Sequence, residues 1–143
     1  MKSKFAVSPF LIVACLCCIG CMGESSTIAV RTAQVAFDEA VPLLNDNDYS
    51  QALPKLESAI QSGSLSADQF AMALLMRSRC YAASSEFDKA KADIDLAEQG
   101  SPNEASLQIA KGYLLAKQGN EAESRSAYQA ALDIDPAALI PKK

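Results

Sequence analysis

The sequence predicts an all-α fold, a helical-repeat solenoid of three helix–turn–helix units. The first observation is that Pro102 and Pro136 stand 34 residues apart and that the residues before them recur with the same shift. A fixed period of this length is typical of stacked helical pairs. The matched pairs are Ser78 with Gly112, Tyr81 with Leu115, Ser85 with Gly119, Ala90 with Ser124, Ile94 with Tyr128, and Ala97 with Ala131.

The second observation is an earlier copy of the pattern, shifted by 38 residues instead of 34. The additional residues fall in the polar stretch 62–69, where an insertion into a surface connection costs little. The three copies then cover about 27–61, 67–100 and 101–136. A helical bundle with accidental periodicity is the alternative. In the earlier copy, Leu43, Tyr49, Ala52, Leu56 and Ala59 match Tyr81, Phe87, Ala90, Ile94 and Ala97.

Local capping signals mark where the first helices begin. Asp48 can cap the second helix, because a side-chain oxygen at this position accepts from an otherwise unpaired amide. Ser66 with Gln69 forms a capping box for the third helix. Together with the apolar spacing, these signals predict helices near residues 27–46, 49–61, 67–83, 86–99, 103–118 and 121–134.

Later signals follow the same logic. The segment 101–104 reads as a capping box with proline at the first helical position, and 120–123 resembles another. Asp135 with Pro136 can open a further helix. Pro42 and Pro54 fall inside the first helical pair, where each removes one backbone hydrogen bond, so the first copy is expected to be the least regular.

The repeated pattern resembles the tetratricopeptide repeat. The chain departs from the family pattern at Ser85, Glu121 and Ser124, and it contains no Trp. The resemblance implies that the first helix of each repeat lines a concave groove that holds a partner. It rests on Gly112, Leu115, Gly119, Tyr128, Ala131 and Pro136, and equally on Tyr81, Phe87, Ala90, Ala97 and Pro102.

By this resemblance, nine side chains form a partner-binding groove. Their centre is mostly apolar, which suits an amphipathic helix or an extended apolar peptide. Chaperone-docking members of the family grip a terminal carboxylate with a Lys/Asn/Arg clamp, but Phe37 and Val41 stand where that clamp would begin. The nine are Phe37, Val41 and Leu44 from the first repeat, Met72, Leu75 and Arg79 from the second, and Ile109, Tyr113 and Lys117 from the third.

Residues 1–20 have the character of a secretory signal peptide. Lys2 and Lys4 precede an apolar stretch, 5–19, that is shorter than the ~20 residues a membrane-spanning helix needs. The segment 18–21, Cys-Ile-Gly-Cys, resembles a bacterial lipobox, which implies cleavage before Cys21 and attachment of lipid to it. The alternatives are an uncleaved anchor and a signal peptide without lipidation.

On this interpretation, residues 21–26 are a lipidated N-terminus and short tether, and 27–140 form the repeat domain. By the lipoprotein sorting rule, Met22 after the cysteine favours the outer membrane of a cell that has two. Cys80 is then the single cysteine left beside Cys21. It is expected to be a buried, unreactive thiol on a core-facing helix side.

The residues that enzymes use most are missing or badly placed. The chain has no His, no phosphate-binding glycine loop and no nucleophile elbow, so we expect no catalysis, no cofactor and no bound metal. The acidic pairs 93/95 and 133/135 do not share a helix face and are expected to be solvated. A pI of about 4.8 without a basic stripe argues against nucleic acid.

The sequence therefore predicts a lipid-anchored repeat scaffold that binds another protein of the bacterial cell envelope. Its role would be the assembly or piloting of an envelope complex, on the periplasmic face of the outer membrane in a cell with two membranes. One alternative is a binder of a small apolar molecule or lipid in the groove. The other is a non-catalytic subunit of an envelope enzyme.

Overall fold

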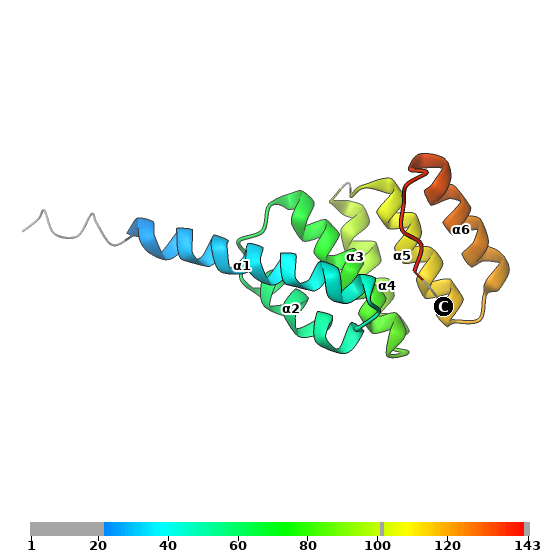
Figure 1. Ribbon diagram of the computed structural model, residues 1–143, viewed down its shortest axis with the longest axis horizontal. Helices are drawn as coiled ribbons and strands as arrows, with labels where there is room; N and C mark the ends of the chain where they lie inside the picture. The colour runs from blue at the N-terminus through cyan, green and yellow to red at the C-terminus, as the bar shows by residue number, and fades with distance from the viewer. Residues whose placement is uncertain (1–21, 101, 142–143) are drawn as a thin grey trace, which may run out of the picture.

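Six α-helices and no strands make up the part of the chain that the structure describes, residues 22–100 and 102–141 of a computed structural model. The all-α prediction is confirmed. Figure 1 shows the helices in a row, with α1 projecting from one end and α6 closing the other. The helices are α1 Met22–Asn45, α2 Tyr49–Gln61, α3 Ala67–Ala83, α4 Phe87–Gln99, α5 Glu104–Lys117 and α6 Glu121–Ile134.

The bounds of α2 to α6 agree with the sequence prediction to within one residue, whereas α1 differs at its start. It begins at Met22, inside the stretch that the sequence assigned to a tether. No proline stops the helix before Pro42, and both α1 and α2 continue through their prolines. The described part of the tether is therefore helical and rises ~1.5 Å per residue, not the ~3.3 Å of an extended chain.

Two of the predicted helix caps are confirmed. The carboxylate of Asp48 accepts a hydrogen bond from the amide of Gln51 at 3.2 Å. The hydroxyl of Ser66 accepts from the amide of Gln69, and the Gln69 side chain accepts from the amide of Ser66. Both helix starts thus satisfy amides that would otherwise lack a partner.

The later capping predictions are wrong. Asn103 caps α5 by accepting from the amide of Ser106 at 3.0 Å, and Ser101 lies outside the described residues. Asn120 makes no side-chain cap bond to α6. Asp135 does not open a helix: its carboxylate accepts from the amide of Ala137, and the chain turns. A helix stopped by Pro141 would be too short to repay the cost of nucleation.

Each helix packs on the next in the chain, and α3 also packs on α5, an arrangement consistent with helical repeats. The matched small residues lie where helices approach one another. A larger side chain at these places would have no space. The exposed fractions are 0% for Ala52, Ala59, Ala90 and Ala131, and 1% for Ala97 and Ser124.

The closest approach of α5 and α6 requires a glycine. A Cβ atom on Gly112 would lie 2.7 Å from Cε1 of Tyr128, which is shorter than any real contact of that type. The hydroxyl of Ser124 donates to the carbonyl oxygen of Gly112 at 2.8 Å. The two small residues together let α6 rest against α5 and seat the Tyr128 ring between them.

The prediction that the acidic pairs are solvated is wrong for Asp93. It is 6% exposed and holds Arg77 of α3 by two hydrogen bonds, Nε to Oδ2 at 2.8 Å and Nη2 to Oδ1 at 2.7 Å. This hydrogen-bonded carboxylate raises the pKa of Arg77 despite the opposing effect of burial. Asp95, Asp133 and Asp135 are exposed, as expected.

Candidate partner-binding face

The chain after α6 folds back over the helix row. In Figure 1 this tail, drawn in red, runs alongside α5 toward the middle of the molecule. Leu139, Ile140 and Pro141 of the tail line two small hollows together with residues of α1, α3 and α5. We call this surface, bounded by the residues of the two hollows, the tail-covered face.

The first hollow lies between α3, α5 and the tail and has a volume of about 100 Å³. Its wall is mainly apolar, with Arg79 as the single charged side chain among the described lining residues. These are Met72, Leu75, Met76, Arg79, Ser106, Ile109 and Leu139.

The second hollow adjoins the first at Arg79 and Leu139 and has a volume of about 140 Å³. Here the end of α1 and the turn that follows it meet the tail. The lining mixes apolar side chains with two amides and, again, one guanidinium. The described lining residues are Leu44, Asn45, Asn47, Arg79, Leu139, Ile140 and Pro141.

The structure brings five of the nine predicted groove residues to this face. Leu44 and Leu75 are each 2% exposed and form its floor. Met72, Arg79 and Ile109 are half-buried and line the first hollow.

The other four predicted residues lie behind or beside the tail-covered face. Tyr113 is 2% exposed, and the Nζ of Lys117 stands 5.2 Å from the centre of its ring. Phe37 packs into the apolar cluster that joins α1, α2 and α3. Val41 is half-buried on α1. None of these four side chains is among the described residues that line the two hollows.

Arg79 is the electrostatic centre of the face. Its Nε atom is buried and has no hydrogen-bond partner among the described residues. The guanidinium carbon lies 5.8 Å from the centre of the Tyr113 ring, a distance at which a cation is attracted to an aromatic face. The face therefore offers a positive charge with an unused donor at the middle of an apolar surface.

Tyr113 remains protonated beneath this charge. Burial raises its pKa first, and a hydrogen bond with Tyr49 raises it further, while Arg79 acts in the opposite direction. The two tyrosine rings lie 5.6 Å apart between centres. With its phenol held neutral, Tyr113 serves as a polar but uncharged support for the two cations above it.

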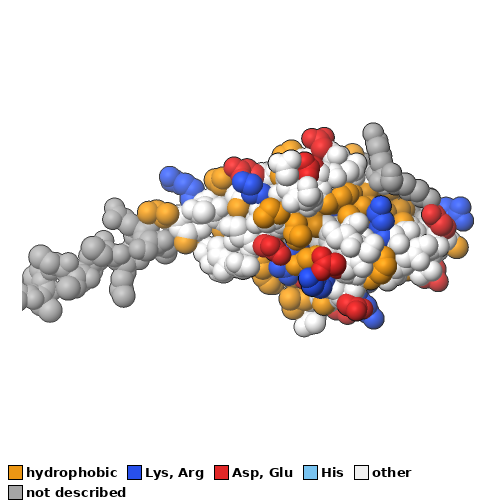
Figure 2. All heavy atoms as spheres, turned by 90° about the horizontal axis from the view of Figure 1, so that it is seen from below, with side chains coloured by type: hydrophobic (Ala, Val, Ile, Leu, Met, Phe, Trp, Pro, Cys, Tyr) orange, Lys and Arg blue, Asp and Glu red, His pale blue; other side chains and the backbone are white. Residues whose placement is uncertain are grey.

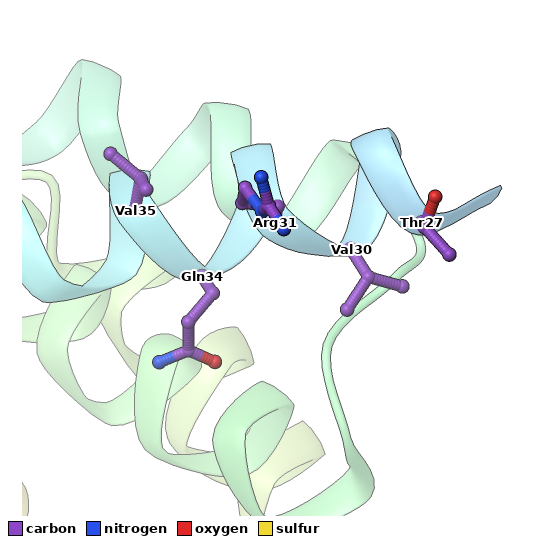
Figure 3. Close-up of a pocket in the computed structure, with 5 residues that line it drawn as sticks. All are labelled: Thr27, Val30, Arg31, Gln34 and Val35. Atoms are coloured by element: carbon purple, nitrogen blue, oxygen red, sulfur yellow. The ribbon is translucent and has the colours of Figure 1, made fainter. Parts of the chain in front are cut away.

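The sequence prediction did not include a larger hollow at the projecting end of α1. It has a volume of about 470 Å³ and is lined by Thr27, Val30, Arg31, Gln34 and Val35. Figure 3 shows Val30 and Gln34 on the same side of α1, where the Gln69 amide of α3 donates to Gln34. The sequence contains a signal for this hollow: residues 27, 30, 31 and 34 are separated by steps of three and four, which place them on one face of a helix.

The remaining surface mixes apolar and charged side chains. Figure 2 shows hydrophobic groups reaching the surface over the helical body with acidic and basic groups between them. Ile28, Leu96 and Ile134 are about half to two-thirds exposed, at 65%, 46% and 52%. They are dispersed over α1, α4 and α6 and do not form one patch.

The prediction that Cys80 is buried is confirmed. It is a free thiol with 1% exposure, and its Sγ lies 3.5 Å from the carbonyl oxygen of Met76. Burial raises the pKa of this thiol to about 12, so it is protonated at neutral pH. Because the thiolate is the reactive form, burial holds Cys80 in its unreactive form.

The features predicted for the amino terminus fall on residues that the structure leaves undescribed. Cys21 and the signal-like segment lie outside the described residues. Within residues 22–100 and 102–141, no helix is both long and apolar enough to cross a membrane. Within the same ranges, no cluster of three or more His, Cys, Asp or Glu side chains is placed to hold a metal ion.

Comparison of the chain with known protein families, with curated proteins and with solved structures finds no match.

Proposed function

We propose that this chain is a membrane-anchored scaffold of the tetratricopeptide type, with three helix–turn–helix units, that mediates protein–protein interaction in the bacterial cell envelope. Assembly or piloting of an envelope complex is the role that suits such a scaffold. The observation that carries the proposal is the tail-covered face, with its apolar floor of Leu44 and Leu75 and its unpartnered Arg79 donor.

The size of the hollows favours a peptide over a small molecule at this face. Sites for small ligands usually enclose about 300–1,000 Å³. The two hollows of about 100 and 140 Å³ are each the size of one or two side chains. A row of shallow side-chain pockets is how extended peptides and amphipathic helices are recognised.

Exchange of Met72 and Ile109 for Glu tests the face. Both side chains are half-buried, so the double variant should fold, whereas charge at the buried Leu75 would disturb the core. Full-length protein is crosslinked in envelope preparations, and captured proteins are quantified by mass spectrometry. We expect the double variant to capture about tenfold less, or still less, of its specific partner than the wild type does, because two contacts with the partner are removed.

The matched control is Leu96→Glu, which adds charge to an exposed apolar position on α4. This control should capture the partner as the wild type does. Equal capture by the double variant and the control, with both folded by circular dichroism, would contradict the proposal.

The membrane anchor has its own test. Cells that express the chain are labelled with palmitate, and the labelled protein is followed by electrophoresis. Cys21→Ser should remove the label and leave a longer, unprocessed precursor, whereas Cys18→Ser should keep the label. Undiminished labelling of the Cys21 variant would exclude this residue as the lipid site.

A second candidate is the binding of a small apolar molecule or lipid. The hollow beside Val30 and Val35 favours it, because its volume of about 470 Å³ lies within the usual range. Native mass spectrometry of the purified chain distinguishes the two: a retained small ligand, lost in Val30→Asp, supports this candidate.

A further inference from the structure

We propose that the tail, Ala137–Pro141, is an intramolecular ligand that keeps the tail-covered face closed. The partner that displaces it is an extended apolar segment that brings a carboxylate to Arg79. This inference rests on the proposed function, because it assumes that the face is where a partner binds. It adds the kind of partner and the way in which access is controlled.

The tail occupies the face without being held firmly. Leu139 lines both hollows yet stays 74% exposed, and Ile140 and Pro141 are half-buried. The hydrogen bonds at its start remain within the turn: the amides of Ala137 and Ala138 both donate to Asp135. Among the described residues, no hydrogen bond joins residues 139–141 to a helix.

The shape of the tail shows which segment the face accepts. Two consecutive apolar residues and a proline follow the turn in neither helix nor strand, and Figure 1 shows this stretch running alongside α5. Leu139 serves both hollows, and Ile140 and Pro141 serve the one beside α1. A partner segment with apolar side chains in the same order would make the same contacts.

The tail leaves one hydrogen-bond donor of Arg79 without an acceptor. Its Nε is buried with no acceptor among the described residues, and it is the one charged side chain of the described lining. A buried donor without a partner is unfavourable, and a charge-assisted hydrogen bond to a carboxylate is among the strongest replacements. A ligand that supplies this acceptor therefore gains an interaction that the tail lacks.

The charges around the face also favour a partner that carries a carboxylate. The ammonium of Lys117 and the guanidinium of Arg79 both lie over the ring of Tyr113. Electrostatic complementarity to these two cations favours a segment that carries a carboxylate.

The test uses a fluorescent peptide with the sequence of residues 135–143 in which both terminal lysines are replaced by glutamate. A matched peptide keeps the two lysines. Binding to the full-length chain in detergent is followed by fluorescence polarisation. The released-tail variant, Leu139→Ser/Ile140→Ser, removes the apolar contacts of the tail without adding charge beside Arg79, and Leu96→Ser is the control on the exposed side of α4.

We expect the released-tail variant to bind the acidic peptide about tenfold or more tightly than the wild type does, because a tethered competitor has a high effective concentration. The control should bind as the wild type does. The released-tail variant should also prefer the acidic to the basic peptide, and Arg79→Met added to it should abolish that preference.

If the wild type and the released-tail variant bind the acidic peptide equally, the tail does not compete for the face. If neither protein binds the peptide, the claim that the tail is a ligand of the face is also wrong. Equal binding of the acidic and basic peptides would overturn the role of Arg79. If the peptide binds as expected but envelope crosslinking shows no partner that depends on Met72 and Ile109, the tail is an intramolecular ligand of the face and the proposed function fails.

Discussion

Cys80 and Tyr113 are ionisable side chains that burial holds in their neutral forms. Burial raises the pKa of the Cys80 thiol from its ordinary 9.0 to about 12. The pKa of Tyr113 also lies above its ordinary value of 10.0, chiefly through burial. In the unfolded chain both groups return to their ordinary values, so the two states bind different numbers of protons in alkaline solution.

The first prediction concerns stability at high pH. A raised pKa in the folded state contributes stability that is complete below the unfolded pKa and is lost progressively as the pH rises toward the folded pKa, for Cys80 from 9.0 to about 12, because only the unfolded chain ionises there. Urea denaturation at pH 8.0 and 10.5 should show a lower midpoint at the higher pH. The variant Cys80→Ala should show a smaller drop. An equal drop in both would contradict the assignment to this thiol.

The second prediction concerns the ion pair of Arg77 and Asp93. With side chains 18% and 8% exposed, removal of one charge leaves the other buried without a partner. Asp93→Ala should therefore lower the free energy of unfolding by about 3 kcal/mol. Asp95→Ala, two residues away on the exposed side, should change it by less than about 0.5 kcal/mol. Similar effects of both changes in chemical denaturation would contradict the structure.

Sequence reasoning could place Cys80 but not Asp93. The burial of Cys80 follows from its own helix, because neighbouring apolar residues mark the core side. The burial of Asp93 depends on Arg77, which comes from another helix 16 residues earlier and reaches it by packing of α3 on α4. The sequence reasoning compared the carboxylates of one helix with one another, so it did not include a partner on another helix.

At the level of the helices, capping chemistry and periodicity predicted most of the boundaries. Asp48 and Ser66 acted as the sequence suggested, since each cap depends on residues within one turn. The start of α1 and the course of the tail were not predictable in this way. Neither segment has a matched copy in the repeats, and the tail is placed by contacts with α1, α3 and α5.

The third prediction tests the contact of α5 with α6. Ala131 is fully buried where the repeated pattern has a small residue, and Ala122 is exposed on the same helix. Ala131→Leu should overpack the contact and cost about 1–3 kcal/mol. Ala122→Leu should leave the denaturation midpoint nearly unchanged. A midpoint for Ala131→Leu within error of the wild type would count against this packing.

The fourth prediction tests the requirement for glycine in α5. Gly112→Ala would place its methyl group against the Tyr128 ring, and the expected cost is about 1–3 kcal/mol even though alanine favours helix. The double variant Gly112→Ala/Tyr128→Ala should lose less stability than the sum of the losses in the two single variants. Strict additivity of the two changes would show that the residues do not meet.

For the whole molecule, the family resemblance predicted a groove lined by nine side chains of α1, α3 and α5, and five of these line the hollows of the tail-covered face. The prediction came from a repeat motif that ends at Pro136. It therefore did not include the tail, which covers these side chains. If the face binds a partner as we propose, that partner must compete with residues 137–141 before it reaches Met72, Arg79 or Ile109.

Photocrosslinking in living cells shows whether the tail-covered face binds another envelope protein. A photoreactive residue replaces Ile109 or Met72 on the face, or Leu96 on α4 as the control. If the face binds a partner, the two positions on it should give an adduct with the same envelope protein, and Leu96 should give none. Absence of an adduct at both face positions, or an equally strong adduct at Leu96, would contradict the proposed function.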